Sequence, residues 1–250
     1  LLTVLFHPED LNMLYLAPAL RRRYMDILLC QCDRNYLVAL SQYNRTLKQR
    51  NALLKAVRET QFKGQNTEKL KADLDAWDVK LIEFATPVIE KRQALVDYLN
   101  KNLPKLYRKI SGDKEDLKVE YQNKIVTNYA DELFNRKSRD IMQAKTTAGP
   151  HRDDLKFFIN GQEISTSASR GEFRTMLLAI KIAEIEYIKA KTGYMPILLL
   201  DDVFSELDLS RQKHLLKAIK GCQTIITTTD ASNIENIAKD NQTFTIVKIA

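Results

Sequence analysis

Several features that would define other protein classes are scarce or missing in this sequence of 250 residues. It has no run of about eighteen apolar residues, so we predict no membrane-spanning helix. Its first residues lack the basic segment and small-residue cleavage site of a secretory signal peptide. Three cysteines, Cys30, Cys32 and Cys222, are too few for a disulfide framework, and we interpret them as reduced thiols. We therefore expect a cytoplasmic protein.

Positive charge is concentrated in one part of the chain. The net charge is +7, and residues 41–110 hold fifteen Lys and Arg against eight Asp and Glu, so the whole surplus of seven lies there. A basic surplus confined to one element suggests a polyanionic partner such as nucleic acid. Solvated helix faces are also often rich in lysine, and composition alone leaves both interpretations open.

The same part of the chain has the pattern of a helical hairpin. The helical pattern of the preceding residues continues into residues 37–61, where leucines recur seven apart and only Arg50 interrupts the apolar seam. After a turn, apolar residues alternate spacings of four and three, the a/d repeat of a coiled coil. We predict an antiparallel helix pair that is kinked or broken at Pro87 and ends near Pro104. The candidate DNA contacts at its tip are Lys63, Lys69 and Lys71.

Strand and helix patterns alternate in the rest of the chain. Three consecutive arginines, residues 21–23, cannot all face a core; they could reach phosphates or acidic neighbours, and we favour the neighbours. The order strand, helix, strand, helix, strand from residue 197 onward predicts an α/β layout with right-handed crossovers. Strands are predicted at residues 3–6, 117–121, 155–159, 163–164, 197–200, 224–230 and 243–249, and helices at 125–142, 173–191, 211–220 and 234–239.

The strand at residues 197–200 ends on two adjacent carboxylates, Asp201 and Asp202. So apolar a run predicts a strand that is buried on both faces. Paired carboxylates at the C-terminal end of such a strand lie where open α/β sheets bind ligands, and they suit a hydrated Mg²⁺ ion and a polarised water. The alternative is a buried strand that is closed by an Asp-Asp cap.

A small, polar loop at residues 166–172 opens directly into the next predicted helix. Ser169 and Gly171 lie at the start of that helix, where exposed N–H groups and the positive end of the helix dipole form an anion site suited to phosphate. N-capping by Ser169 alone is the simpler alternative.

The order of these signals resembles the C-terminal lobe of ABC-type ATPases with coiled-coil inserts, the group that contains the SMC proteins. Within that group the sequence is similar to the RecF family, from residue 1 to about residue 230. The similarity is carried by the segments Phe6-His7-Pro8-Glu9-Asp10-Leu11, Arg21-Arg22-Arg23 with Asp26-Ile27-Leu28-Leu29, Leu47-Lys48-Gln49-Arg50-Asn51, Gly149-Pro150-His151-Arg152-Asp153-Asp154, Leu198-Leu199-Leu200-Asp201-Asp202-Val203 and Arg211-Gln212-Lys213-His214-Leu215-Leu216.

The resemblance implies a role for each candidate residue. Asp201 would act on Mg²⁺, and Asp202 would orient or deprotonate the attacking water. Residues of the signature loop would contact the γ-phosphate of ATP held by the opposite subunit, and the D-loop would lie across the dimer. The signature residues are Ser169, Arg170, Gly171 and Glu172; the D-loop residues are Ser205, Glu206 and Asp208; and Thr228 or Thr229 would occupy the switch position.

The resemblance also implies an overall organisation and function. The fold would be an α/β ABC-ATPase-type C-terminal lobe with an inserted arm, with residues 1–36 as the remnant of an N-terminal lobe, 37–110 as the arm and 111–250 as the lobe. The protein would be a recombination mediator that binds ATP and Mg²⁺, dimerises on ATP, and acts with other mediator proteins at gapped or junction DNA, single-stranded DNA included. The alternatives are a non-catalytic DNA-binding or scaffolding protein, or another SMC-like ATPase.

Two features depart from the family pattern. Arg170 and Glu172 stand where the family has glutamines, which affects how the γ-phosphate would be sensed. No Gly-x-x-x-x-Gly-Lys-Ser/Thr occurs in the sequence, and in this family that phosphate loop precedes the position of Leu1. Since the chain does not begin with Met, we expect that it is the larger, C-terminal part of a longer protein and that it is inactive as an ATPase alone.

Overall fold

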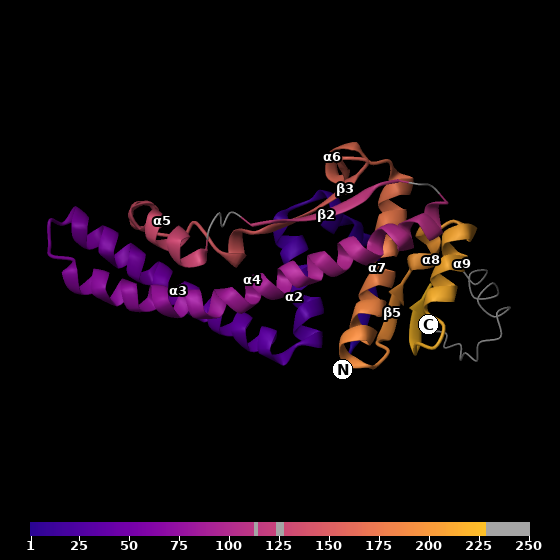
Figure 1. Ribbon diagram of the computed structural model, residues 1–250, viewed down its shortest axis with the longest axis horizontal. Coiled ribbons are helices and arrows are strands. Elements are labelled where there is room, and N and C mark those ends of the chain that lie inside the picture. The colour runs from indigo at the N-terminus through magenta and orange to yellow at the C-terminus, as the bar shows by residue number, and fades with distance from the viewer. Residues whose placement is uncertain (113–114, 124–127, 229–250) are drawn as a thin grey trace. The chain divides into compact units, whose positions relative to one another are not determined.

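The computed structural model describes residues 1–112, 115–123 and 128–228 (Figure 1). They form two compact units. Unit 1 comprises Leu1–Leu16 and the described parts of Lys101–Lys118 and Phe158–Ala250, and unit 2 comprises Ala17–Asn100 and the described part of Val119–Phe157. The helix and strand expected after residue 230 lie outside the described residues, and the division expected at residues 36 and 110 stays a prediction.

Unit 1 is built on a parallel sheet of three strands in the order β1-β5-β6. These are β1 (Thr3–Phe6), β5 (Ile197–Asp201) and β6 (Thr224–Thr227). The central strand β5 pairs with β1 from Thr3↔Ile197 to Phe6↔Leu200, and with β6 from Leu198↔Thr224 to Asp201↔Thr227. The predicted α/β class is confirmed, and the acids that end β5 lie between the ends of two strands distant in sequence.

Burial of β5 differs from the prediction in one respect. Leu198 and Leu200 are buried, but Ile197, Leu199 and Asp201 on the other face are only half-buried by the described residues. A continuous aliphatic run has no alternation that would distinguish its two faces, so the sequence could not indicate which face is fully covered.

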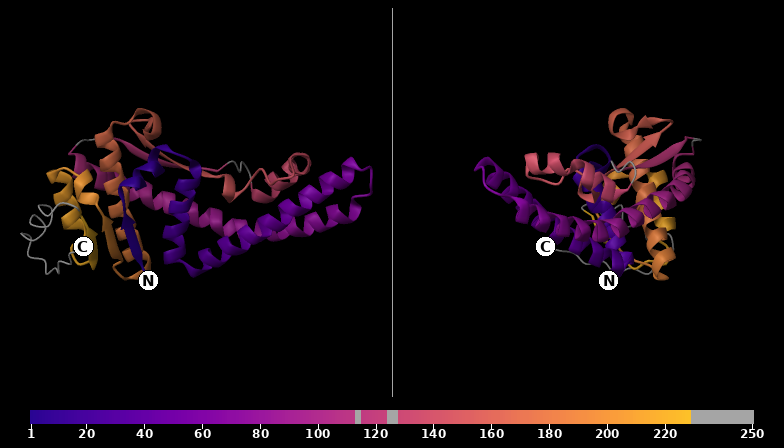
Figure 2. Two further views of the ribbon diagram at one scale, coloured as in Figure 1. Left: turned by 180° about the vertical axis from the view of Figure 1, so that it is seen from behind. Right: turned by 60° about the vertical axis from the view of Figure 1, so that its left-hand side comes forward.

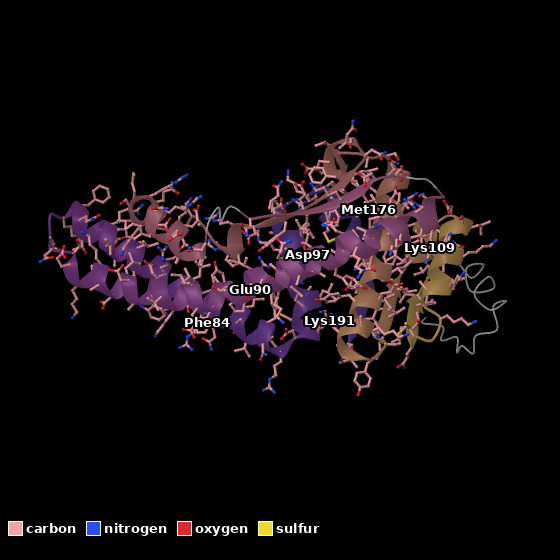
Figure 3. The ribbon with its side chains drawn as sticks, viewed as in Figure 1. Phe84, Glu90, Asp97, Lys109, Met176 and Lys191 are labelled. Carbon is pink, nitrogen blue, oxygen red and sulfur yellow. The ribbon has the colours of Figure 1, made fainter. Side chains whose placement is uncertain are left out.

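Several helices of unit 1 accompany this sheet. The longest is α7 (Arg170–Thr192), which begins three residues earlier than expected and ends at Gly193, whose φ is +79°. Figure 3 marks α7 near its two ends by Met176 and Lys191. Within α7, the buried Lys181 Nζ donates to the Leu5 carbonyl at 2.6 Å and lies 3.1 Å from an Asp10 oxygen. It therefore fixes α7 to β1 and the turn after it. The shorter helices are η1 (Pro8–Leu11), α1 (Asn12–Tyr15), α6 (Ile164–Ser167), α8 (Val203–Glu206) and α9 (Leu209–Ala218).

A second sheet has the order β2-β3-β4, with β2 (Leu117–Gln122), β3 (Asp154–Ile159) and β4 (Gln162–Glu163). As predicted, β3 and β4 form an antiparallel hairpin around Asn160-Gly161. Both turn residues have positive φ, +50° and +78°, which is the conformation that a two-residue hairpin turn of this type requires.

Unit 2 contains α2 (Pro18–Cys32), α3 (Arg34–Phe62), residues 68–100 of α4 (Glu68–Ser111), α5 (Tyr129–Gln143) and the turn η2 (Pro150–Arg152). Its helices α3 and α4 run antiparallel and side by side in every view (Figures 1 and 2), as the repeat pattern predicts. No helix of the described residues is long and apolar enough to cross a membrane.

Two helix boundaries were predicted wrongly. The helix expected to run through residue 36 is interrupted at Asp33, whose side chain accepts from the N–H groups of Asn35 and Tyr36 and caps α3. Conversely, α4 continues through Pro87 and Pro104 to Ser111. Its apolar stripe continues on both sides of each proline, and the packing of that stripe outweighs the loss of one N–H donor at each position.

Arg50, the residue that interrupts the apolar seam of α3, is completely buried. Its Nε lies 2.5 Å from Asp78 Oδ1 on α4, and its Nη1 lies 2.7 Å from Asp140 Oδ2 on α5. The same Nη1 donates to Thr146 Oγ1 at 2.8 Å. One guanidinium group therefore joins α3 to three other segments of unit 2. The polar residue in the apolar seam of α3 has a specific structural role.

We expect Arg50→Met to lower the free energy of unfolding by about 3–5 kcal/mol, because it leaves the buried Asp140 carboxylate without its cation. Urea titrations followed by the fluorescence of Trp77, the single tryptophan and a neighbour of Asp78, would measure this. Arg45→Met, at an exposed position of the same helix, is the matched control and should cost less than about 0.5 kcal/mol. Equal stability of the two variants would contradict a structural role for the junction.

Candidate functional site

Asp201, the last residue of β5, is contacted from both neighbouring strands. Its Oδ1 accepts a hydrogen bond from Thr227 Oγ1 at the end of β6, at 2.5 Å. Its Oδ2 lies 3.3 Å from Nε2 of His7, which follows β1. The His7 Nδ1 atom accepts from the Glu9 N–H at 3.1 Å, so the ring carries its hydrogen on Nε2 and directs it at Asp201. The C-terminal ends of all three strands therefore converge on one carboxylate.

Asp202 adopts a strained backbone conformation beside Asp201. Its φ is +50°, in the left-handed region that costs a non-glycine residue roughly 1–2 kcal/mol. Its Oδ2 accepts from Ser205 Oγ at 3.0 Å, whereas its Oδ1 is buried and has no hydrogen-bond partner among the described residues. Strain of this kind is common at functional sites, and the unpartnered oxygen is free to accept from a water or contact a cation.

The predicted D-loop residues all make contacts inside the chain. Besides Ser205, Glu206 on α8 forms an ion pair with Arg174 of α7 at 2.6 Å, and both side chains are partly exposed. Asp208 caps α9 by accepting from the Arg211 N–H at 2.8 Å. Glu206 therefore holds α8 against α7, and Asp208 fixes the start of α9.

The predicted signature loop forms a capping box at the start of α7. Ser169 Oγ accepts from the Glu172 N–H at 3.3 Å, and Glu172 Oε2 accepts from the Ser169 N–H at 2.7 Å. These bonds to Ser169 lower the pKa of the Glu172 carboxyl below its ordinary value. Glu172 thus has a structural reason to stand in this loop, while Ser169 and Arg170 remain exposed. Capping does not exclude contact with a phosphate, which stays a prediction.

Arg211 joins the start of α7 to the start of α9. Its Nε and Nη2 atoms donate to Thr175 Oγ1 at 3.0 and 2.7 Å, and Nη2 also donates to the Gly171 carbonyl at 3.1 Å. Its Nη1 is paired with Asp208. The sequence placed Arg211 in a family-like segment but indicated no role for it. Its partners Thr175 and Gly171 lie on α7, and a local sequence pattern cannot indicate contacts with another helix.

Contacts link Asp202 to Ser205, and Arg211 links Gly171 to Asp208, but the switch position stays untested. The hydroxyl that contacts Asp201 belongs to Thr227, which the sequence did not single out; Thr228 follows it, and Thr229 lies outside the described residues. No group of three or more His, Cys, Asp or Glu in the described part of the chain is arranged to hold a metal ion. An ion at Asp201 and Asp202 would therefore rely on water and phosphate oxygens for the rest of its shell, as Mg²⁺ commonly does.

The predicted DNA contacts lie in unit 2, at the turn between α3 and α4. Lys63 follows the last residue of α3, and Lys69 and Lys71 lie in the first turn of α4. Lys63 and Lys69 are exposed, and Lys71 is half-buried with its Nζ 3.9 Å from a Glu68 oxygen. The three amines thus lie at one end of the hairpin.

This fold and these residues define the class of the protein: an α/β lobe of the ABC-ATPase type with an inserted helical hairpin. No family model matches the chain. A DNA replication and repair protein RecF from Streptococcus equi subsp. zooepidemicus is 40% identical over 259 residues, which cover 99% of this chain and 67% of that relative. The RecF of Agathobacter rectalis is 41% identical over 247 residues, covering 98% of this chain and 66% of the relative.

Two solved structures that are similar to this chain are also of RecF proteins. The structure of the recombination mediator protein RecF-ATP in the RecFOR pathway is 36% identical and superposes with a TM-score of 0.81 over 92% of this chain and 62% of that one. The chain therefore belongs to the RecF family. It spans about two thirds of the length of the relatives it matches.

We expect Arg211→Ala to loosen the junction between α7 and α9, because it removes three hydrogen bonds to Thr175 and Gly171 and the pair with Asp208. The loss should be roughly 1.5–3 kcal/mol, the range for hydrogen bonds to a charged group. Thermal unfolding would measure it, and hydrogen exchange should be faster in the first turn of α7. Lys213→Ala, at an exposed position of α9, is the control. Unchanged exchange at residues 171–175 in the Arg211 variant would contradict the junction.

Proposed function

We propose that this chain provides the acid-bearing lobe of a cytoplasmic recombination mediator that binds ATP and acts on gapped or junction DNA. The observation that carries this proposal is the convergence of His7 and Thr227 on Asp201, beside the strained Asp202 with its unpartnered oxygen. Similarity to RecF proteins of DNA replication and repair supports the substrate classes. A solved relative in complex with ATP supports the nucleotide.

In this proposal the two acids have different tasks. Asp201, held by Thr227 and His7, is oriented to ligate Mg²⁺ directly or through water. When bound, Mg²⁺ would neutralise charge on the phosphate oxygens of ATP. Asp202 would accept a hydrogen bond from the attacking water through the oxygen that lacks a partner among the described residues. The Ser205 hydroxyl holds the other Asp202 oxygen and so fixes the carboxylate plane.

We further propose that a second copy completes the site on ATP binding. Ser169, Arg170 and Asp208 are exposed, so residues of another subunit and its nucleotide can reach them. The N-terminus of α7 carries the positive end of a helix of 23 residues, which favours the γ-phosphate. Arg211 ties this helix start to the D-loop, so contact at one would be transmitted to the other.

Asp202→Asn in the intact protein should reduce DNA-dependent ATP hydrolysis by about 10²-fold or more, because an amide cannot accept the proton of the attacking water. ATP binding should persist, since the substitution keeps the size of the side chain. A phosphate-release assay and fluorescent-nucleotide binding would separate the two effects. Asp73→Asn, at an exposed position of α4, is the matched control. Hydrolysis at the normal rate by the Asp202 variant would exclude this catalytic assignment.

Replacing Lys63, Lys69 and Lys71 by Gln should weaken DNA binding and flatten its salt dependence. Each lost phosphate contact should lower the slope of log affinity against log salt by roughly 0.7–0.9. Anisotropy titrations at several salt concentrations would measure both quantities. The control replaces three exposed lysines near the other end of α4, Lys101, Lys105 and Lys109. If the tip variant retains the affinity and slope of the unmodified protein, the hairpin tip does not contact DNA.

A further inference from the structure

Unit 2 contains a cavity of about 480 Å³ that the candidate site does not use. Its walls come from α2, the start of α3, α4 and the turn η2. The volume lies within the roughly 300–1,000 Å³ of small-molecule sites. The polar residues of its lining are Arg22, Arg23, Asp26, Asn44, Arg92 and His151.

The lining of this cavity is positively charged. Three arginines against one aspartate leave a surplus of two positive charges. Arg92 is buried, and its charge is neutralised locally because its Nη2 lies 2.8 Å from Asp26 Oδ1. Its Nη1 donates to the Pro150 carbonyl at 2.7 Å. The surplus therefore resides on Arg22 and Arg23.

Arg22 is a half-buried cation without a carboxylate partner. Its Nη1 donates to the Asp153 carbonyl at 2.7 Å, and no carboxylate of the described residues lies within ion-pair distance of it. Burial and the neighbouring Arg92 lower the pKa of Arg22 below its ordinary value, and the charges of Asp154, Asp153 and Asp26 offset this only in part. Its neighbour Arg21, in contrast, is paired with both oxygens of Asp154 at 2.7 and 3.0 Å. A desolvated guanidinium group of this kind favours an external anion.

The inner wall beside these arginines is rigid and neutral. The His151 ring lies 2.5 Å from the Tyr43 hydroxyl through Nδ1 and 3.1 Å from the Thr146 carbonyl through Nε2. Burial lowers the pKa of His151 to about 4, so it adds no charge at neutral pH. Gly149 precedes this turn with φ of +125°, and a Cβ there would meet the Tyr129 and Tyr43 hydroxyls at 2.5 and 2.7 Å. Any other residue at position 149 would therefore clash with these two hydroxyl groups.

We propose that the cavity binds a phosphate group of a nucleic-acid strand, with Arg22 and Arg23 as its ligands. The planar fork of a guanidinium group matches phosphate oxygens, and four N–H donors of Arg22 have no hydrogen-bond partner among the described residues. The apolar lining of Ala19, Ile27 and Leu40 gives the attached sugar or base a surface to pack against. The inference rests on the proposed function for the identity of the polyanion.

The test measures binding of a fluorescein-labelled single-stranded oligonucleotide to the intact protein over a range of salt concentrations. Replacing Arg22 and Arg23 together by Gln should weaken binding about tenfold and lower the salt slope by roughly 0.7–0.9, the value for one phosphate contact. Arg23→Gln alone should produce part of the loss. This exposed residue has no hydrogen-bond or ion-pair partner in the described part of the chain, so its replacement does not threaten folding. Arg139→Gln, exposed on α5, is the matched control and should bind normally.

The outcomes separate this inference from the proposed function. If the unmodified protein binds the oligonucleotide and both arginine variants bind it with equal affinity and slope, the cavity does not take a strand, whether it then holds free phosphate or an acidic protein segment. Stabilisation of only the unmodified protein by inorganic phosphate, with DNA affinity unchanged in the variants, would likewise overturn the inference. If the unmodified protein does not bind DNA at all, the proposed function itself fails.

Discussion

The candidate site depends on the pairing of β5 with β1 on one side and β6 on the other. This pairing places His7 and Thr227 beside Asp201, although the three residues belong to separate parts of the chain. Parallel neighbours align their carboxyl ends at one edge, so side chains that follow each strand must meet there. A register slip of one residue would turn Asp201 to the other face and separate it from the Thr227 hydroxyl.

In unit 2, buried ion pairs join segments that are distant in sequence. Arg50 joins α3 to α4 and α5, and Arg92 joins α4 to α2 and the turn η2. Desolvation offsets most of the attraction in such pairs, so their net contribution to stability is modest. Loss of one partner is costly, however, because it leaves a buried charge. A helical hairpin with a regular apolar seam could slide along itself, and the pair between Arg50 and Asp78 favours the observed register.

The sequence predicted the elements better than it predicted their contacts. The acid-ended strand, the Asn160-Gly161 hairpin and the helix pair follow from local patterns and were found in the structure. The boundaries at Asp33 and beyond Pro104 were wrong because capping and long-range packing decided them. Thr227, His7 and Arg211 were not assigned roles because their partners lie on other strands or helices. Residue types and spacing indicated the chemistry of the acids, but not which oxygen lacks a partner.

In both units, adjacent residues of the same type have different environments. Some of their charged groups are paired inside the fold, and others have no charged partner there. Consecutive residues of a helix point about 100° apart, so the arginine run divides: Arg21 meets Asp154, whereas Arg22 and the exposed Arg23 line the cavity. The prediction that these arginines meet acidic neighbours therefore holds for Arg21. The acids after β5 divide in the same way, since Asp201 has two partners and Asp202 keeps one oxygen unpartnered among the described residues. In each set of neighbours, the group that the fold leaves unsatisfied has capacity for a further hydrogen bond.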